Sequence, residues 1–269
     1  MTRRLKEDFL QHCRDNNLAG VTDCLSRGVD VNTVSEDGRW SGLTIAAEKN
    51  YPELLEILLS HPDVEMNITT DLNRWGSRTP MTALMFACEA GNSDIVSRLV
   101  QEPGVDLNYE DEFGETAAHQ ACRRSRVECV RILAETGRVD WNKGNMRDMI
   151  PLYWALEAGC SGIVDIIVKQ PNIDWNYRID FDDDGDTLAH AALMGGDEKC
   201  VETLAALEIF DCWNLPNKDG DTPVMGAVKR NWTEIVEILL RCPRVDLNCR
   251  DKKGWSLVFR AVQCGNFGE

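Results

Sequence analysis

Self-similarity with a period of about 34 residues constrains this chain more than any other feature. A small side chain recurs at one place in a short helical pattern, and successive copies lie 33, 41, 34, 34, 37, 35 and 34 residues apart. These copies are Cys13, Ala46, Ala87, Ala121, Ala155, Ala192, Ala227 and Ala261. Such units gain stability by stacking on their neighbours. The 269 residues therefore predict a repeat array rather than one or two ordinary globular domains.

The best-formed copy runs from Gly114 to Asn142 and predicts two short helices. A Gly-x-Thr turn precedes the first helix, which carries small side chains, and Gly137 ends the second. The second helix has an apolar stripe at helical spacing, formed by Val127, Val130, Ile132 and Leu133. The repeating unit is thus a turn followed by a helix pair.

A second marker, an apolar-acidic-x-Asn signature, closes the units with the same period. It occupies residues 29–32, 64–67, 105–108, 139–142, 173–176 and 245–248, with an altered copy at 211–214. Two independent markers that keep one period argue against chance similarity.

The turn into the first helix resembles the Thr-Pro-Leu-His-x-Ala motif of the ankyrin repeat family. Residues 116–121 and 222–227 match it well, 150–155 and 187–192 match it fairly, and 41–46 and 256–261 are degenerate copies. The resemblance covers essentially the whole chain. It implies an all-α ankyrin-repeat solenoid of about eight helix-turn-helix units with β-turn fingers, the turns that precede the first helices.

The markers divide the chain into a capping repeat, six full repeats and an incomplete last repeat. The expected bounds are 1–32 for the N-terminal cap, 33–67, 68–108, 109–142, 143–176, 177–214 and 215–248 for the full repeats, and 249–269 for the last. Residues 254–264 supply a turn and a first helix without a second helix. We expect either a fragment of a longer protein or an end that frays.

Charge and cysteine content narrow the class of partner and the compartment. The formal net charge of -16 repels nucleic acid and anionic membranes and attracts basic partners. The N-terminus has no apolar signal region, so the eleven cysteines favour a reducing compartment, the cytoplasm or the nucleus. No apolar run is long enough for a membrane span, which predicts a soluble chain.

The two long spacings predict insertions in two fingers, at 68–81 and 177–186. Binding residues concentrate on loops held by a rigid scaffold, so these fingers are candidate binding elements. The second contains Asp182, Asp183 and Asp184 in a D-x-D-x-D-G pattern that resembles half of an EF-hand calcium loop. The twelfth position is Ala191 instead of Glu, which favours a solvated acidic finger over a calcium site of few carboxylates.

No motif predicts catalysis. The four histidines have no cysteine partner at zinc-ligand spacing, and the glycines recur singly rather than in a phosphate loop. The resemblance gives His119 and His190 a structural role, in hydrogen bonds between neighbouring turns. We therefore expect no enzyme activity, cofactor or metal.

Tryptophans occupy two kinds of position. Trp141, Trp175 and Trp213 precede the closing Asn of successive units, which indicates packing. Trp40, Trp75 and Trp255 lie in turns or fingers, where exposed aromatic side chains are candidate binding anchors, although each can instead fold back onto its helix pair.

The resemblance also implies which positions face a partner: the fingers and the groove positions, the two residues before the mid-repeat Gly. Besides Trp40, Trp75 and Trp255, the candidate binding residues are Glu48, Glu89, Tyr109, Phe113, Glu115, Arg123, Arg124, Glu157, Asp182, Asp183, Asp184, Asp186, Met194, Asp221, Lys229 and Arg230. We expect a monomeric protein-protein interaction scaffold for a protein or peptide, with a Lys/Arg-rich segment favoured by the acidic charge. The alternative is a targeting module of a larger enzyme or signalling protein.

Overall fold

The computed structural model describes residues 3–70, 80–175, 177–179, 185–208 and 212–264. In this part of the chain there are fifteen α-helices, one two-stranded sheet and one 3-10 helix. The helices fall into two compact units, Met1–Asp140 and Trp141–Glu269, which are described in turn.

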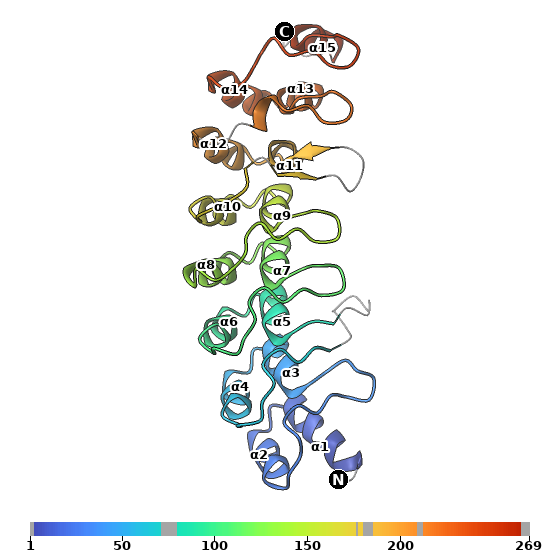
Figure 1. Cartoon of the computed structure of the whole chain (residues 1–269), viewed down its shortest axis with the longest axis vertical. Coiled ribbons are helices and arrows are strands. Elements are labelled where there is room, and N and C mark those ends of the chain that lie inside the picture. The colour runs from blue at the N-terminus through green and yellow to red at the C-terminus, as the bar shows by residue number, and fades with distance from the viewer. Residues whose placement is uncertain (1–2, 71–79, 176, 180–184, 209–211, 265–269) are drawn as a thin grey trace. The chain divides into compact units, whose positions relative to one another are not determined.

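The first unit consists of four helix pairs. Its helices are α1 (Arg3–Arg14), α2 (Leu18–Ser26), α3 (Gly42–Lys49), α4 (Pro52–Leu59), α5 (Ala83–Ala90), α6 (Ser93–Leu99), α7 (Ala117–Arg123) and α8 (Val127–Glu135). The first helices α1, α3, α5 and α7 pack on one another in chain order, and α2, α4, α6 and α8 form a second layer (Figure 1). The expected helix pairs are confirmed.

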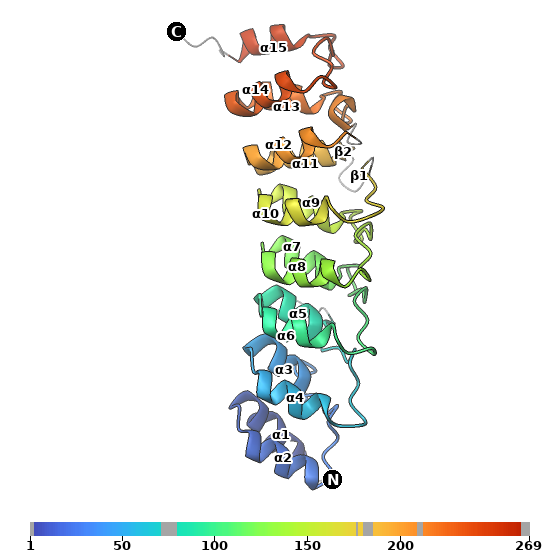
Figure 2. The same ribbon diagram turned by 90° about the vertical axis from the view of Figure 1, so that its left-hand side faces the viewer.

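The second unit repeats this two-layer packing. Its helices are α9 (Pro151–Glu157), α10 (Ser161–Ile167), α11 (Leu188–Gly195), α12 (Glu198–Ala206), α13 (Pro223–Lys229), α14 (Thr233–Arg241) and α15 (Leu257–Gln263), with η1 at Cys212–Asn214. The strands β1 (Arg178–Ile179) and β2 (Asp186–Thr187) pair antiparallel just before α11 (Figure 2). The last helix, α15, packs on α13 as a first helix. Residues 265–269 lie outside the described part.

Side-chain caps fix where the first helices begin. The N–H of Thr116 donates to His119 Nδ1 at 3.0 Å, and the N–H of Thr187 donates to His190 Nδ1 at 3.2 Å. The other ring nitrogen of His190 lies 3.0 Å from the backbone carbonyl of Asp221, in the next turn. The structural role expected for His190 is therefore confirmed.

A residue in the left-handed conformation reverses the chain between the two helices of each complete pair. Three pairs use glycine, as at Gly91 with φ 86°, and the other four use Asn16, Asn50, Ser125 and Asn231. Left-handed φ is costly for residues with a Cβ, least so for Asn, and Ser125 at φ 54° is the least suited of these.

The closing Asn of the apolar-acidic-x-Asn signature ties one repeat to the next. The Nδ2 of Asn108 donates to the carbonyl of Arg138 at 2.9 Å, and its Oδ1 accepts from the N–H of Asp140 at 2.8 Å. Four more Asn side chains make the same two bonds, each to a backbone carbonyl and a backbone N–H that lie 30 to 39 residues further along the chain. They are Asn32, Asn67, Asn142 and Asn214. A β-turn connection in each repeat is thus held by the preceding one.

The core consists of the facing sides of the helices, with three tryptophans of the second unit beside them. Trp141, Trp175 and Trp213 are buried, which confirms the packing role expected for them. Most of the cysteines are also buried as small side chains. None of the helices in the described residues is long and apolar enough to cross a membrane.

Candidate functional site

Four fingers, at 111–115, 145–149, 217–221 and 251–255, are closed by an Asp or Asn side chain at their base. The Oδ1 of Asp111 accepts from the N–H groups of Phe113 at 2.9 Å and Glu115 at 2.8 Å, and Gly114 takes positive φ between them. Burial raises the pKa of Asp111, although these N–H groups favour its charged form. Asn145, Asn217 and Asp251 close their fingers with the same two bonds. The fingers therefore present side chains from a fixed backbone.

In the first unit, a finger carboxylate is neutralised by the end of its own first helix. Glu115 is buried and accepts from Arg123 Nη1 at 3.1 Å and from Gln120 Nε2 at 3.0 Å. Arg123 also donates to Gln120 Oε1 at 2.6 Å. These three side chains form a closed network at the base of the finger.

Glu89, a second candidate binding residue, is paired between repeats. Its carboxylate lies 2.9 Å from Arg124 Nη2, and its backbone carbonyl accepts from Arg126 Nε at 3.1 Å. The side chain of Glu89 is 8 % exposed. Arg123 and Arg124, both candidate binding residues, thus each neutralise one buried carboxylate.

The groove positions between α3 and α5 line a cavity of about 290 Å³. Its wall includes Glu48, Lys49, Phe86 and Glu89. Glu48 lies 3.6 Å from Lys49 Nζ, and Lys49 is half exposed. The Glu48 side chain is 19 % exposed, against 8 % for Glu89, although its Oε2 is buried.

The aromatic candidates differ in exposure. Trp40 is half-buried, with its ring 5.7 Å from that of Phe86, and Tyr109 is also half-buried. Phe113 at a finger tip is 49 % exposed. In the second unit Trp255 is half-buried, 4.7 Å from the Phe259 ring and 4.4 Å from the Arg260 guanidinium. Trp75 lies outside the described residues.

In the second unit, the space between α11 and α13 is a cavity of about 410 Å³. Asp221 and Lys229 form an ion pair on its wall, and the Arg230 guanidinium lies 5.3 Å from the Trp232 ring. Asp186 accepts from the Asn217 amide at 3.2 Å, and Met194 is 43 % exposed. Five candidate residues, Asp186, Met194, Asp221, Lys229 and Arg230, are thus brought together here.

The remaining acidic candidates lie elsewhere. Glu157 is exposed at the end of α9, and partial burial of its carboxyl raises its pKa. Asp182, Asp183 and Asp184, with the calcium alternative that rests on them, lie outside the described residues. Within the described ranges no group of three or more His, Cys, Asp or Glu side chains is placed to hold a metal ion.

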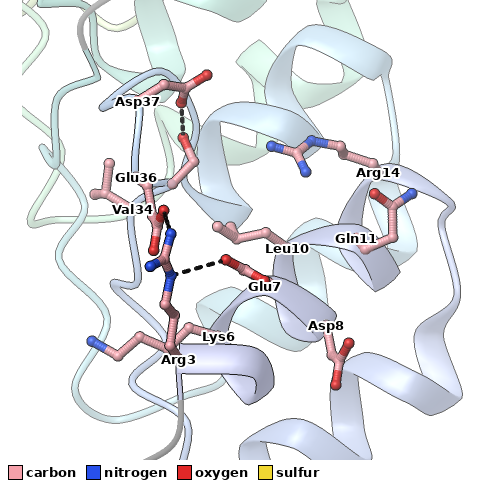
Figure 3. Close-up of a pocket in the computed structure, with 11 residues that line it drawn as sticks. Arg3, Lys6, Glu7, Asp8, Leu10, Gln11, Arg14, Val34, Glu36 and Asp37 are labelled. Carbon is pink, nitrogen blue, oxygen red and sulfur yellow. Dashed lines mark hydrogen bonds and ion pairs between the residues drawn. The ribbon is translucent and has the colours of Figure 1, made fainter.

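Sequence reasoning missed two places. A cavity of about 450 Å³ lies between α1 and the finger at 34–37, where Arg3 pairs with Glu36 and, at 3.4 Å, with Glu7 (Figure 3). Its lining alternates in charge, and nothing in the repeat pattern marks it. Asp219 and Gly226, on the wall of the α11–α13 cavity, were also missed. The sequence signal that could have found this cavity is Gly226, which has no side chain at the helix position where α7 has Gln120.

Comparison with known proteins agrees with this architecture. The family model for ankyrin repeats (3 copies) matches residues 9–111, 84–179 and 188–268. The chain is similar to glycerophosphocholine phosphodiesterase gde1 of Schizosaccharomyces pombe, 32% identical over 47% of this chain and 10% of the relative. It is also similar to the human transient receptor potential cation channel subfamily A member 1, with 25% identity over 59% of this chain and 14% of the relative. Mouse cortactin-binding protein 2 is 31% identical over 48% of this chain and 7% of the relative. The matches thus span about a tenth of the length of these relatives.

Proposed function

The chain belongs to the ankyrin repeat family, and on that premise we propose that it is a non-catalytic scaffold that binds a protein or peptide through its fingers and groove positions. Repeats of this family are generally protein-protein interaction modules. The observation that carries the proposal is the set of rigid fingers, each closed by an Asp or Asn side chain beside a groove position. Rigid loops bind without a large cost in ordering.

The favoured partner is a Lys/Arg-rich segment. The formal net charge is -16, so the long-range field attracts a basic chain. Because Glu89 and Glu115 are already paired inside the first unit, the proposed docking carboxylates are Glu48, Glu157 and Asp186. We assign the protein to the cytoplasm or nucleus as a monomer; its cysteines are free thiols in the described residues.

A labelled peptide of alternating Gly and Arg tests this function directly. Its affinity for the protein should fall steeply between low and high salt, because exposed charges are screened. The triple variant Glu48→Gln, Glu157→Gln, Asp186→Asn should weaken binding at low salt, whereas Glu53→Gln, Glu128→Gln, Glu198→Gln, three exposed glutamates on second helices, should not. Absence of binding, or binding that is independent of salt, would reject the basic partner.

A second candidate function is a targeting or regulatory module of a larger enzyme or signalling protein. The relatives favour this candidate, because they include a phosphodiesterase and a cation channel. The matches span only about a tenth of the length of these proteins. Sequencing the full transcript tests this candidate. A catalytic or channel domain in the same reading frame would support it, and a stop codon directly after residue 269 would reject it.

A further inference from the structure

Two repeats carry the same acid-base pair but differ in the residue between its members. In the first unit Glu115 pairs with Arg123, and in the second Asp221 pairs with Lys229; the partners are eight residues apart in both. Gln120 lies at the fourth position of α7, and the fourth position of α13 is Gly226. The amide of Gln120, which joins Glu115 and Arg123 in the first unit, therefore has no counterpart between Asp221 and Lys229 in the second unit.

The missing amide leaves an acceptor without a donor. Glu115 Oε2 takes a hydrogen bond from Gln120 Nε2, whereas Asp221 Oδ1 is buried and has no hydrogen-bond partner among the described residues. The other oxygen of Asp221 is used by Lys229. A buried acceptor without a donor costs free energy, so this position favours a ligand that brings an N–H group.

The place that Gln120 fills in α7 is bordered in α13 by the Arg230 guanidinium, whose Nη1 donates to the Gly226 carbonyl at 3.4 Å. A Cβ built on Gly226 would meet only Arg230 Nη1 at 3.4 Å and Leu193 Cδ1 at 3.8 Å, which are ordinary contact distances. The cavity of about 410 Å³ lies here. A side chain that enters the cavity therefore meets the place of the missing amide beside the Arg230 guanidinium.

The walls of this cavity suit a long side chain with a cationic head. Leu193 and the half-exposed Met194 form an apolar side. Asp186, bonded to a neutral amide, and Asp219 add two carboxylates to that of Asp221. Of the two cations at the wall, Lys229 is paired with Asp221, and Arg230 lies against the Trp232 ring. The negative charge exceeds the positive.

We propose that this cavity is the specificity pocket for one arginine side chain of the basic partner, so the inference rests on the function proposed above. The guanidinium donates to Asp221 Oδ1 in place of the missing glutamine amide and pairs with Asp186 or Asp219, while its methylenes lie on Leu193 and Met194. Arginine fits better than lysine because its planar head offers several N–H donors in fixed directions to separate carboxylates.

The probe is the peptide acetyl-Gly-Gly-Arg-Gly-Gly-amide, with lysine and citrulline analogues. Citrulline keeps the planar shape of the arginine head but has a carbonyl oxygen in place of one of its nitrogens, and it carries no charge. NMR shifts of the Gly226 amide and the Met194 methyl group should change saturably with the arginine peptide. The lysine peptide should bind several-fold more weakly than the arginine peptide. The citrulline peptide should bind about tenfold more weakly or worse. Equal binding of all three, or no shift at these two groups, would overturn the proposal.

The decisive variant is Gly226→Gln, which restores the residue that α7 has and changes no charge. It should abolish the shifts caused by the arginine peptide, and it should fold because a helical Gly is replaced by a better helix former whose Cβ would make only ordinary contacts. Asp186→Asn should weaken binding, and Glu234→Gln, an exposed residue of α14, is the matched control.

The longer Gly-Arg peptide separates the two proposals. If it binds the wild-type protein with salt dependence and binds Gly226→Gln equally well, the pocket is wrong and the basic-partner function stands. If it binds neither protein, the basic-partner function is wrong as well. Weaker binding to Gly226→Gln alone supports both.

Discussion

The side chain of Asn108 accepts a hydrogen bond from the backbone N–H of Asp140, a residue of the following repeat, at 2.8 Å. The same side chain donates to the carbonyl of Arg138. One amide therefore matches a donor and an acceptor of the next turn, which only Asn or Gln can do. This geometry gives a physical reason for the Asn that closes each unit.

Replacing Asn108 by Ala should lower the free energy of unfolding by about 1–2 kcal/mol, because both backbone groups lose their partner. Urea unfolding followed by circular dichroism measures the change. Asn248→Ala is the matched control, since this Asn holds the same motif position and has no side-chain hydrogen bond in the described residues. Equal losses in the two variants would show that the bonds across repeats contribute nothing specific.

Ser125 offers a stabilising substitution. Its φ of 54° is strained for a residue with a Cβ, and glycine adopts it freely. Ser125→Gly should raise the free energy of unfolding by about 0.5–1 kcal/mol. The reverse change at the equivalent place, Gly91→Ala, should destabilise, because a Cβ there would also lie 2.8 Å from Arg126 Cδ. If Ser125→Gly proves destabilising, another interaction of the serine outweighs its backbone strain.

His190 should make stability depend on pH. Burial lowers its pKa below the ordinary value, against the opposite effect of the Asp186 and Asp221 carboxylates. The unfolded chain then binds the proton more readily than the folded chain. The contribution of neutral His190 is complete above about pH 6.5 and is lost as the pH falls through the lower, folded-state pKa.

Urea unfolding of the wild type and of His190→Asn at pH 7.5 and pH 5 measures this contribution. Asn keeps an acceptor for the Thr187 N–H and does not titrate. The wild type should lose more stability than the variant over this range. Identical losses would mean that His190 binds its proton equally in both states.

The features that the sequence predicted are those set by residues close together in the chain. Contacts between residues far apart in the chain were not predicted. The helix pairs follow from patterns of neighbouring residues, such as the turn motif at 116–121, and they agree with the structure. The pairing of Glu89 with Arg124 joins residues 35 apart on different helices, and only packing brings them together. The cavity above Gly226 depends on an absent side chain, which a search for chemical motifs does not register.

The pair Glu89 and Arg124 is expected to act as a structural link between repeats. The carboxylate of Glu89 is 8 % exposed, so removing Arg124 alone leaves a charge with poor access to water. In a double-mutant cycle of Glu89→Gln and Arg124→Gln, the two changes should be coupled by about 1 kcal/mol or more. Glu157→Gln, at the equivalent position of α9 but exposed, should not change stability.

The same variants separate stability from recognition. If Glu89 is a structural residue, Glu89→Gln should lower the free energy of unfolding while the affinity for the Gly-Arg peptide, measured well below the unfolding transition, stays unchanged. Glu157→Gln should give the opposite result, because Glu157 is an exposed residue at the end of α9 and is accessible to a basic partner. A drop in affinity for Glu89→Gln as large as that for Glu157→Gln would contradict this. It would show that the Glu89 carboxylate breaks its ion pair with Arg124 and contacts the partner.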